Sequence, residues 1–157
     1  MMQAFRTENN YRNASRLSAA ELRAAMASRE ILQSTALAFD TQRQLRFELG
    51  GCRAVMPFGQ CADGADTGSV RDIAVLTRVG RPTCFVIEGI DTDENGQTVY
   101  HLSRAEAQRM CKAEYLDQLQ PGDILPCIVT HIEPFGAFCD VAVSYTHLRA
   151  HETDQYL

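Results

Sequence analysis

Short stretches of alternating apolar and polar residues, separated by turn sequences, recur along this chain and constrain its fold more than any other feature. Residues 45–49 alternate apolar and charged side chains, which is the period of an antiparallel strand with one buried face. Gly50 and Gly51 then turn the chain into another apolar stretch, residues 54–57. The pattern predicts strands that are joined directly by tight turns.

Three further segments complete the pattern. Residues 31–39, 83–87 and 98–102 are strand-like, and Asn95-Gly96 at the centre of residues 91–97 is a strong hairpin signal. Residues 59–68 are polar and Gly-rich, as in a loop, whereas residues 73–79 fit either a helix or a strand. Five short strands with accessory helices favour a mainly β fold, and specifically a closed five-stranded barrel of the oligonucleotide-binding (OB) type.

Two helices are predicted from their first residues. Ser18 is followed three positions later by Glu21, and Ser103 is followed in the same way by Glu106, which is the capping-box spacing. The first helix has an apolar stripe that includes Leu22 and Ala25, and the second is expected to run to about residue 119. Residues 1–17 lack apolar periodicity and are interpreted as a loose arm.

The strand pattern begins again after the second helix. Residues 124–131 and 136–143 read as strands around a turn, and residues 131–141 match residues 39–49 over eleven positions. The chain is therefore expected to hold one barrel and the start of its repeat. The predicted units are an N-terminal arm and helix (1–30), a first barrel (31–103), a linking helix (104–120), a truncated second barrel (121–143) and a non-native tail (144–157). That tail resembles translated adapter sequence, so we exclude it from the fold, including its closely spaced His147 and His151.

Charge and cysteine content narrow the possible functions. A net charge of −5 and a pI near 5.3 argue against a protein that coats nucleic acid by bulk attraction. Six cysteines without a Cys-x-x-Cys spacing, and without a signal peptide, indicate reduced thiols in the cytoplasm and no metal site. The apolar stretches are far shorter than the roughly 20 residues of a membrane span.

Residues 121–141 carry the most specific motif. Gly122-Asp123 near the first strand and Phe135-Gly136-Ala137-Phe138 on the second resemble the opening of the S-one-type RNA-binding module. This module is named after protein one of the bacterial small ribosomal subunit, and the likeness spans roughly residues 31–143. Residues 70–74 and 102–104 also resemble bacterial proteins that carry such modules in tandem.

The resemblance implies an OB-fold barrel and RNA contacts at two aromatic side chains, Phe135 and Phe138. An unpaired base stacks on such a ring for about 1–3 kcal/mol, with little sequence preference. Gly136 between them lets a nucleic-acid backbone come close. The alternative interpretation is that both rings fill a core.

The first barrel departs from this signature, since Arg43 and Arg46 stand where the two Phe residues would be, and Gln44 replaces the glycine. Guanidinium groups also stack on bases and bind phosphates, so both arginines are candidate RNA contacts. Exposed arginines on a solvated strand are an equally simple interpretation.

We therefore expect a non-catalytic protein without cofactor that binds single-stranded RNA or mRNA, with a role in translation and the ribosome as a second candidate partner. An alternative is a protein-interaction module on the ribosome that makes no RNA contact. An enzyme is disfavoured because no Ser/His/Asp cluster, phosphate loop or paired-carboxylate site accompanies the barrel. The oligomeric state stays open. Two strands cannot close a barrel, so residues 122–143 are expected to be poorly ordered, to pair with the first barrel, or to promote association.

Overall fold

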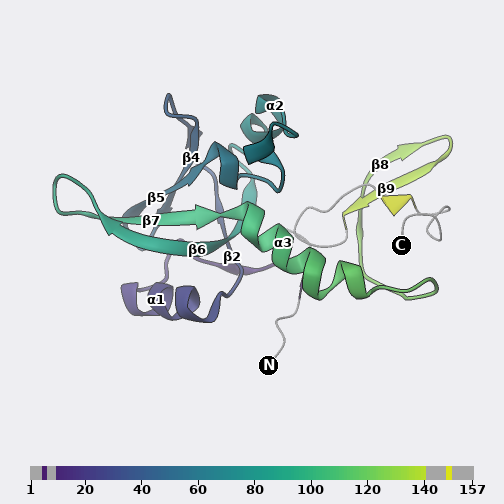
Figure 1. Cartoon of the computed structure of the whole chain (residues 1–157), viewed down its shortest axis with the longest axis horizontal. Coiled ribbons are helices and arrows are strands. Elements are labelled where there is room, and N and C mark those ends of the chain that lie inside the picture. The colour runs from purple at the N-terminus through teal and green to yellow at the C-terminus, as the bar shows by residue number, and fades with distance from the viewer. Residues whose placement is uncertain (1–4, 7–9, 141–147, 150–157) are drawn as a thin grey trace.

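The computed structural model describes residues 5–6, 10–140 and 148–149, and the fold is mainly β, as predicted (Figure 1). A curled seven-stranded sheet consists of β1 (Arg12–Asn13), β2 (Leu32–Thr35), β3 (Ala38–Phe39), β4 (Gln44–Leu49), β5 (Cys52–Pro57), β6 (Pro82–Thr92) and β7 (Thr98–Ser103). The helices are α1 (Ala19–Ser28), α2 (Asp72–Leu76) and α3 (Arg104–Glu114), with single 3-10 turns η1 (Phe58–Gln60), η2 (Ala65–Thr67) and η3 (Leu116–Gln118). A separate small sheet consists of β8 (Ile128–Glu133), β9 (Gly136–Asp140) and β10 (Leu148–Arg149).

The strand order of the main sheet, β1-β2-β6-β7-β5-β4-β3, explains why it curls. Only residues 36–37 separate β2 from β3, yet β2 pairs with β6 whereas β3 pairs with β4 at the far end of the strand order. The N–H of Leu37 donates to the Arg46 carbonyl at 2.8 Å, while the Ala36 carbonyl accepts from the N–H of Gly80 at 2.8 Å. The predicted strand 31–39 is therefore bent in its middle, and its two halves bring distant strands together.

The alternation predicted for residues 45–49 is confirmed. Leu45, Phe47 and Leu49 are buried inside the curled sheet, and the ring of Phe47 packs against Phe85 on β6 with 5.7 Å between centroids. Arg46, between them in sequence, is half-buried on the outer face. A fully buried ring of this kind typically contributes about 3–5 kcal/mol, judged from Phe→Ala substitutions. The hydrophobic core thus lies on the concave side of the sheet.

The N-terminal region is more ordered than the sequence indicated. Helix α1 begins as predicted, because Ser18 and Glu21 form both bonds of the capping box. The expectation of a loose arm over residues 1–17 is wrong for its described C-terminal part, since β1 pairs in parallel with β2 and Tyr11 and Ala14 are buried. The N–H of Tyr11 also donates to the Gln33 side chain at 2.8 Å. Backbone pairing with a distant strand leaves no periodic signal in a two-residue strand.

Helix α3 belongs to the main body and is not merely a linker. It ends at Glu114, before the predicted end near residue 119, and it packs against β6. Its Ala107 and Cys111 join a second core cluster, whose buried members are Tyr11, Ile31, Cys84, Val86, Ala107 and Cys111. One face of the helix predicted as a link over residues 104–120 is thus buried in the fold.

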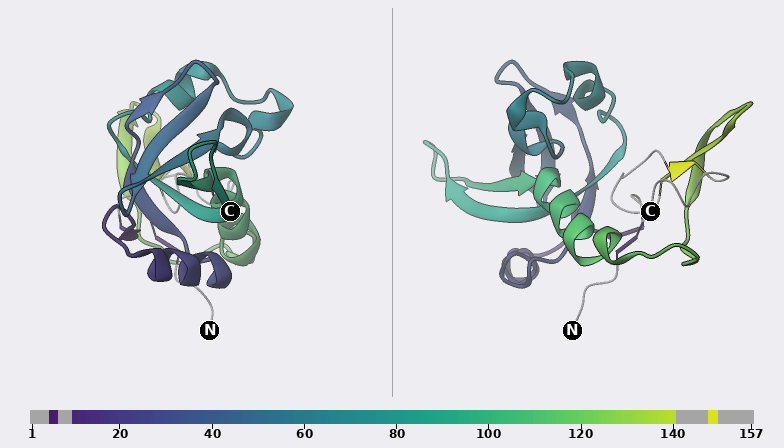
Figure 2. Two further views of the ribbon diagram at one scale, coloured as in Figure 1. Left: turned by 90° about the vertical axis from the view of Figure 1, so that its left-hand side faces the viewer. Right: turned by 45° about the vertical axis from the view of Figure 1, so that its right-hand side comes forward.

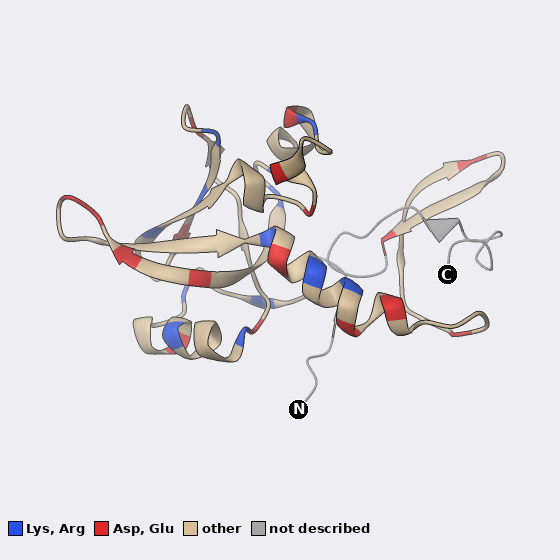
Figure 3. Cartoon of the chain, viewed as in Figure 1, with Lys and Arg blue, Asp and Glu red and all other residues tan. Residues whose placement is uncertain are grey.

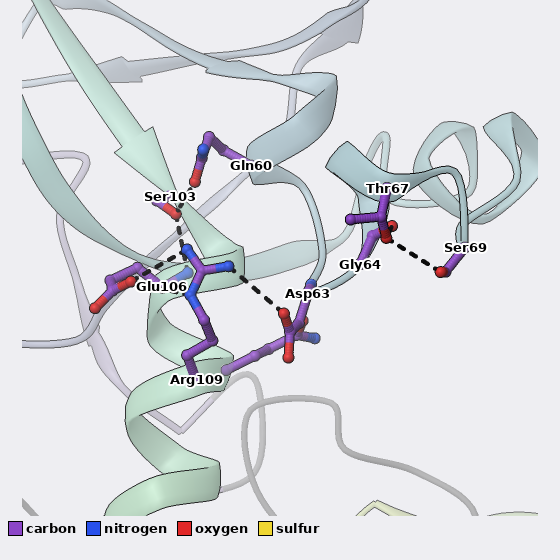
Figure 4. A network of polar contacts seen from close by, with 9 residues as sticks. Gln60, Asp63, Gly64, Thr67, Ser69, Ser103, Glu106 and Arg109 are labelled. Atoms are coloured by element: carbon purple, nitrogen blue, oxygen red, sulfur yellow. Dashed lines mark hydrogen bonds and ion pairs between the residues drawn. The ribbon is translucent and has the colours of Figure 1, made fainter.

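A polar network fastens the start of α3 to the predicted loop 59–68 (Figure 4). The Ser103 hydroxyl accepts from the N–H of Glu106 at 2.9 Å, as the capping pattern predicted, and donates to the side-chain oxygen of Gln60 at 2.6 Å. Arg109 donates to Glu106 at 3.2 Å and to Asp63 at 3.5 Å. The loop itself is shaped by η1 and η2.

The structure also decides the predictions for residues 73–79, for the hairpin turn and for the start of β8. Residues 73–79 include the short helix α2, so the helical alternative applies there. Asp93 accepts from the N–H groups of Asn95 and Gln97 at 2.9 Å each, which forms the predicted hairpin turn between β6 and β7. Strand β8 begins at Ile128, later than the predicted residue 124, and the side chain of Ile124 is 99% exposed.

The β8–β9 hairpin lies apart from the curled sheet (Figures 1 and 2). Its described strands pair with each other and with β10, and the main sheet contains neither of them. Of the expectations for residues 122–143, pairing with the first barrel is therefore wrong for the described residues. The unit predicted as a non-native tail, 144–157, lies outside the described residues except for Leu148–Arg149.

Candidate nucleic-acid interface

The β8–β9 hairpin places the aromatic residues of the predicted motif by its register. Glu133 pairs with Gly136 and His131 pairs with Phe138, so Pro134 and Phe135 form the two-residue turn between the strands. Cross-strand partners share one face of a hairpin. Phe138 therefore lies on the same face as His131, and Phe135 lies at the end of that face.

The two Phe rings contact each other edge to face. Their centroids are 6.1 Å apart and their planes meet at 87°, a favourable aromatic geometry. Phe135 is 45% exposed and Phe138 is half-buried. The interpretation that both rings fill a core is therefore wrong for Phe135, because nearly half of its surface faces solvent.

His131 is a third ring in this group, and sequence reasoning did not single it out. Its centroid lies 6.1 Å from that of Phe138, with the planes tilted by 32°, and its Nε2 contacts the Glu133 carboxylate. A two-residue turn at Pro134 and Phe135 would have placed His131 opposite Phe138, so hairpin geometry was the missed signal. We call His131, Phe135 and Phe138 the aromatic cluster.

Gly136 is the first residue of β9 and lies beside this cluster. Its φ of +152° is a conformation that residues with side chains rarely adopt. The opposite face of the hairpin carries Ile132 and Ala137, which pair with each other, and Ile132 is 75% exposed. Exposed side chains thus occur on both faces near the turn, with rings on one face and Ile132 on the other.

Arg43, a predicted RNA contact of the first barrel, already has partners within the protein. Its Nη2 donates to Asp72 at 2.8 Å, and its Cζ lies 4.2 Å from the centroid of the Phe58 ring. Its side chain is still 55% exposed, so it remains accessible to a ligand. A phosphate would have to compete with the Asp72 carboxylate.

Arg46 lies on a different part of the surface. It lines a shallow groove of about 420 Å³ on the outer face of β4 and β5, together with Glu48 and Arg53. Arg43 does not line this groove, so the structure does not bring the two predicted arginines into one site. Sequence reasoning did not identify Arg53. It lies opposite Glu48 in the pairing of β4 with β5.

Carboxylates partly neutralise the neighbouring surface on β5, β6 and β7. Arg53 lies 3.7 Å from Asp93, and the His101 ring lies 3.4 Å from Asp91. Acidic residues also occupy the tip of the β6–β7 hairpin, as Figure 3 shows. The outer face of the sheet therefore carries charges of both signs.

The described residues contain no candidate metal site. Among them no group of three His, Cys, Asp or Glu residues could hold a metal ion. All six cysteines are free thiols. None of the described helices is long and apolar enough to cross a membrane. Comparison of the chain with models of known protein families and with curated proteins finds no match.

Proposed function

We propose that this chain is an RNA-binding protein of the S-one type that stacks unpaired bases on Phe135 and Phe138. The observation that carries the proposal is the aromatic cluster on one face of the β8–β9 hairpin, in which Phe135 is 45% exposed and Phe138 is half-buried. A solvent-exposed aromatic ring offers a flat apolar surface to an unpaired base, and such stacking depends little on the base sequence. The proposed activity is binding without catalysis.

The strand order supports the OB-fold part of this proposal. If β2 and β3 are counted as one bent strand and β1 is left out, the order becomes a ring of five strands. A five-stranded barrel with Greek-key connections is the OB architecture. The β8–β9 hairpin would then be the opening of a second barrel of the same type.

In OB folds the face of the second and third strands binds oligonucleotides, and here these strands are β4 and β5. Arg46 and Arg53 line the groove on this face, and Arg43 precedes β4. We propose that these arginines hold phosphates, while the aromatic cluster holds bases. The nearby carboxylates favour local contacts over non-specific attraction along the strand.

The proposed partner is single-stranded RNA or mRNA in the cytoplasm, with a role in translation and the ribosome as a second candidate partner. The test is fluorescence anisotropy of an unstructured RNA titrated with the whole chain. Phe135→Ala combined with Phe138→Ala should weaken binding at least about tenfold, given about 1–3 kcal/mol for each stacked base.

Ile132→Ala is the matched control, because Ile132 is exposed on the opposite face of the same hairpin. It should leave the affinity unchanged. Equal RNA affinity of the double Phe variant and the original chain would exclude stacking on the aromatic cluster.

The second candidate is a protein-interaction module on the ribosome that makes no RNA contact. The pairing of Arg43 with Asp72 and of Arg53 with Asp93 favours it, because both leave less free positive charge for phosphates. Under this alternative, no RNA binding appears in the anisotropy titration, and association with ribosomal proteins survives nuclease treatment.

A further inference from the structure

Two cysteines lie close together at the open end of the β8–β9 hairpin. Cys127 is exposed and immediately precedes Ile128, the first residue of β8, whereas Cys139 is buried on β9. Ile128 pairs with Asp140 and Val129 pairs with Cys139, so the register makes Cys127 and Cys139 diagonal neighbours. Diagonal neighbours share one face of an antiparallel pair and lie about 7–8 Å apart.

We propose that Cys127 and Cys139 are a redox pair that forms a reversible disulfide with a small-molecule disulfide as the oxidant. The Cys127 thiolate attacks one sulfur of the oxidant, which forms a mixed disulfide and releases one small thiol. Cys139 then loses its proton and attacks the Cys127 sulfur, which forms the protein disulfide and releases the second small thiol. Two protein thiols are oxidised, and one small disulfide is reduced to two thiols.

The different exposure of the two thiols sets this order of attack. Cys127 is reached from solvent, while burial raises the pKa of Cys139. A buried thiol of raised pKa is a poor first nucleophile but can resolve a mixed disulfide beside it. Because Cys127 precedes the first paired residue of β8, it can move the short distance that disulfide geometry requires.

The other four cysteines do not offer such a pair. Cys84 and Cys111 belong to one core cluster, but both are fully buried, so an oxidant has no access to either. Cys61 is fully buried as well, and Cys52 is half-buried on β5 in the main sheet. Only the pair on the hairpin combines proximity with one solvent-exposed thiol among the described residues.

The disulfide would close the hairpin at the end opposite its turn. A two-stranded hairpin is marginally stable in water, and this one has exposed side chains on both faces. A cross-link between Cys127 and Cys139 restricts its unfolded states and therefore slows its opening. This consequence concerns the hairpin itself and does not depend on RNA binding.

The test treats the whole chain with oxidised glutathione at neutral pH, blocks the remaining thiols with iodoacetamide and maps the peptides by mass spectrometry. We expect a disulfide-linked peptide pair that contains Cys127 and Cys139, and its loss after addition of reduced glutathione. Cys139→Ser should instead accumulate glutathione on Cys127, whereas Cys127→Ser should leave Cys139 unmodified.

Cys52→Ser is the control and should leave the disulfide yield unchanged. A stable glutathione adduct on Cys127 of the original chain, a link between two chains, or no reaction would overturn the proposal. In the oxidised chain, amide hydrogens of residues 128–140 should exchange at least about tenfold more slowly. If the disulfide forms but hydrogen exchange is not slowed, the bond does not stabilise the hairpin against opening.

Discussion

Arg43 lies over the ring of Phe58, with 4.2 Å between its Cζ and the ring centroid, although its backbone adopts a left-handed conformation with φ of +58°. A cation on an aromatic ring at an exposed site contributes about 0.5–1 kcal/mol. The left-handed backbone costs a residue with a side chain about 1–2 kcal/mol. The side-chain contacts and the backbone strain at this position therefore nearly balance.

This balance predicts different stabilities for two substitutions of Arg43 that both remove its guanidinium. Arg43→Ala loses the contacts with Phe58 and Asp72 and keeps the strained backbone, so it should be clearly destabilising. Arg43→Gly loses the same contacts but relieves the strain, and it should be about 1 kcal/mol more stable than Arg43→Ala. Urea unfolding of both variants measures the difference, and equal midpoints would show that the backbone is unstrained.

The capping box of α1 predicts a second effect on stability. Ser18 accepts from the N–H of Glu21, and the Glu21 carboxylate accepts from the N–H of Ser18. Ser18→Ala should lower the free energy of unfolding by about 1 kcal/mol. Ser18→Asp keeps an acceptor at the same position and should restore most of this loss, whereas equal losses in both variants would argue against the cap.

Alkaline pH should destabilise the fold through its buried thiols. Burial raises the pKa of Cys61 to about 11 and that of Cys111 to about 12, and burial also raises the pKa of Tyr11. In the unfolded chain thiols ionise near pH 8.5, so the unfolded state loses these protons first. Stability should be constant below about pH 8.5 and fall as the pH rises toward the folded-state pKa values.

Urea unfolding at a series of pH values from neutral to about pH 10 measures this slope. Cys111→Ala removes one of the titrating groups. This variant should be less stable at neutral pH because it leaves a cavity, but its stability should depend less steeply on pH. If this variant shows the same dependence of stability on pH, other groups cause the loss of stability at alkaline pH.

Hydrogen exchange should differ between the two sheets. On β8, Ile128, Val129 and Ile132 are 48%, 53% and 75% exposed, whereas Phe85 and Val86 on β6 are buried. The free energy of local unfolding is lowest where few apolar groups are buried. In the reduced chain, amides of β8 and β9 should exchange at least about tenfold faster than those of β6 and β7, as mass spectrometry would show. Equal protection in a monomer would contradict the separation of the hairpin.

Association is a further consequence of the same exposure. The hairpin presents Ile128 and Ile132 to solvent, and β8 is an edge strand of its small sheet. Exposed apolar edge strands favour pairing between chains. Sedimentation should therefore show concentration-dependent association, and Ile132→Lys should reduce it. A chain that remains monomeric at high concentration would contradict this expectation.

Local sequence patterns were sufficient for the alternating strand β4, the helix caps and the hairpin turn between β6 and β7. The alternation of Leu45, Phe47 and Leu49 identifies the buried face of β4, and Ser18 identifies the start of α1. Each of these signals depends on residues a few positions apart, and the structure follows them. The spacing of the aromatic motif also pairs Phe135 with Phe138, whose rings contact each other edge to face.

Tertiary structure alone decided how distant segments meet. The bend at residues 36–37 brings β2 to β6 and β3 to β4, and Tyr11 is buried against α3 although its surroundings carry no periodicity. The partners of Arg43 follow from the placement of α2 and η1, which no local pattern specifies. The sequence by itself determined the local elements because hydrogen bonds and apolar faces repeat over a few residues. Long-range contacts depend on the packing of the whole chain, and they decide which of the predicted site residues are available to a ligand.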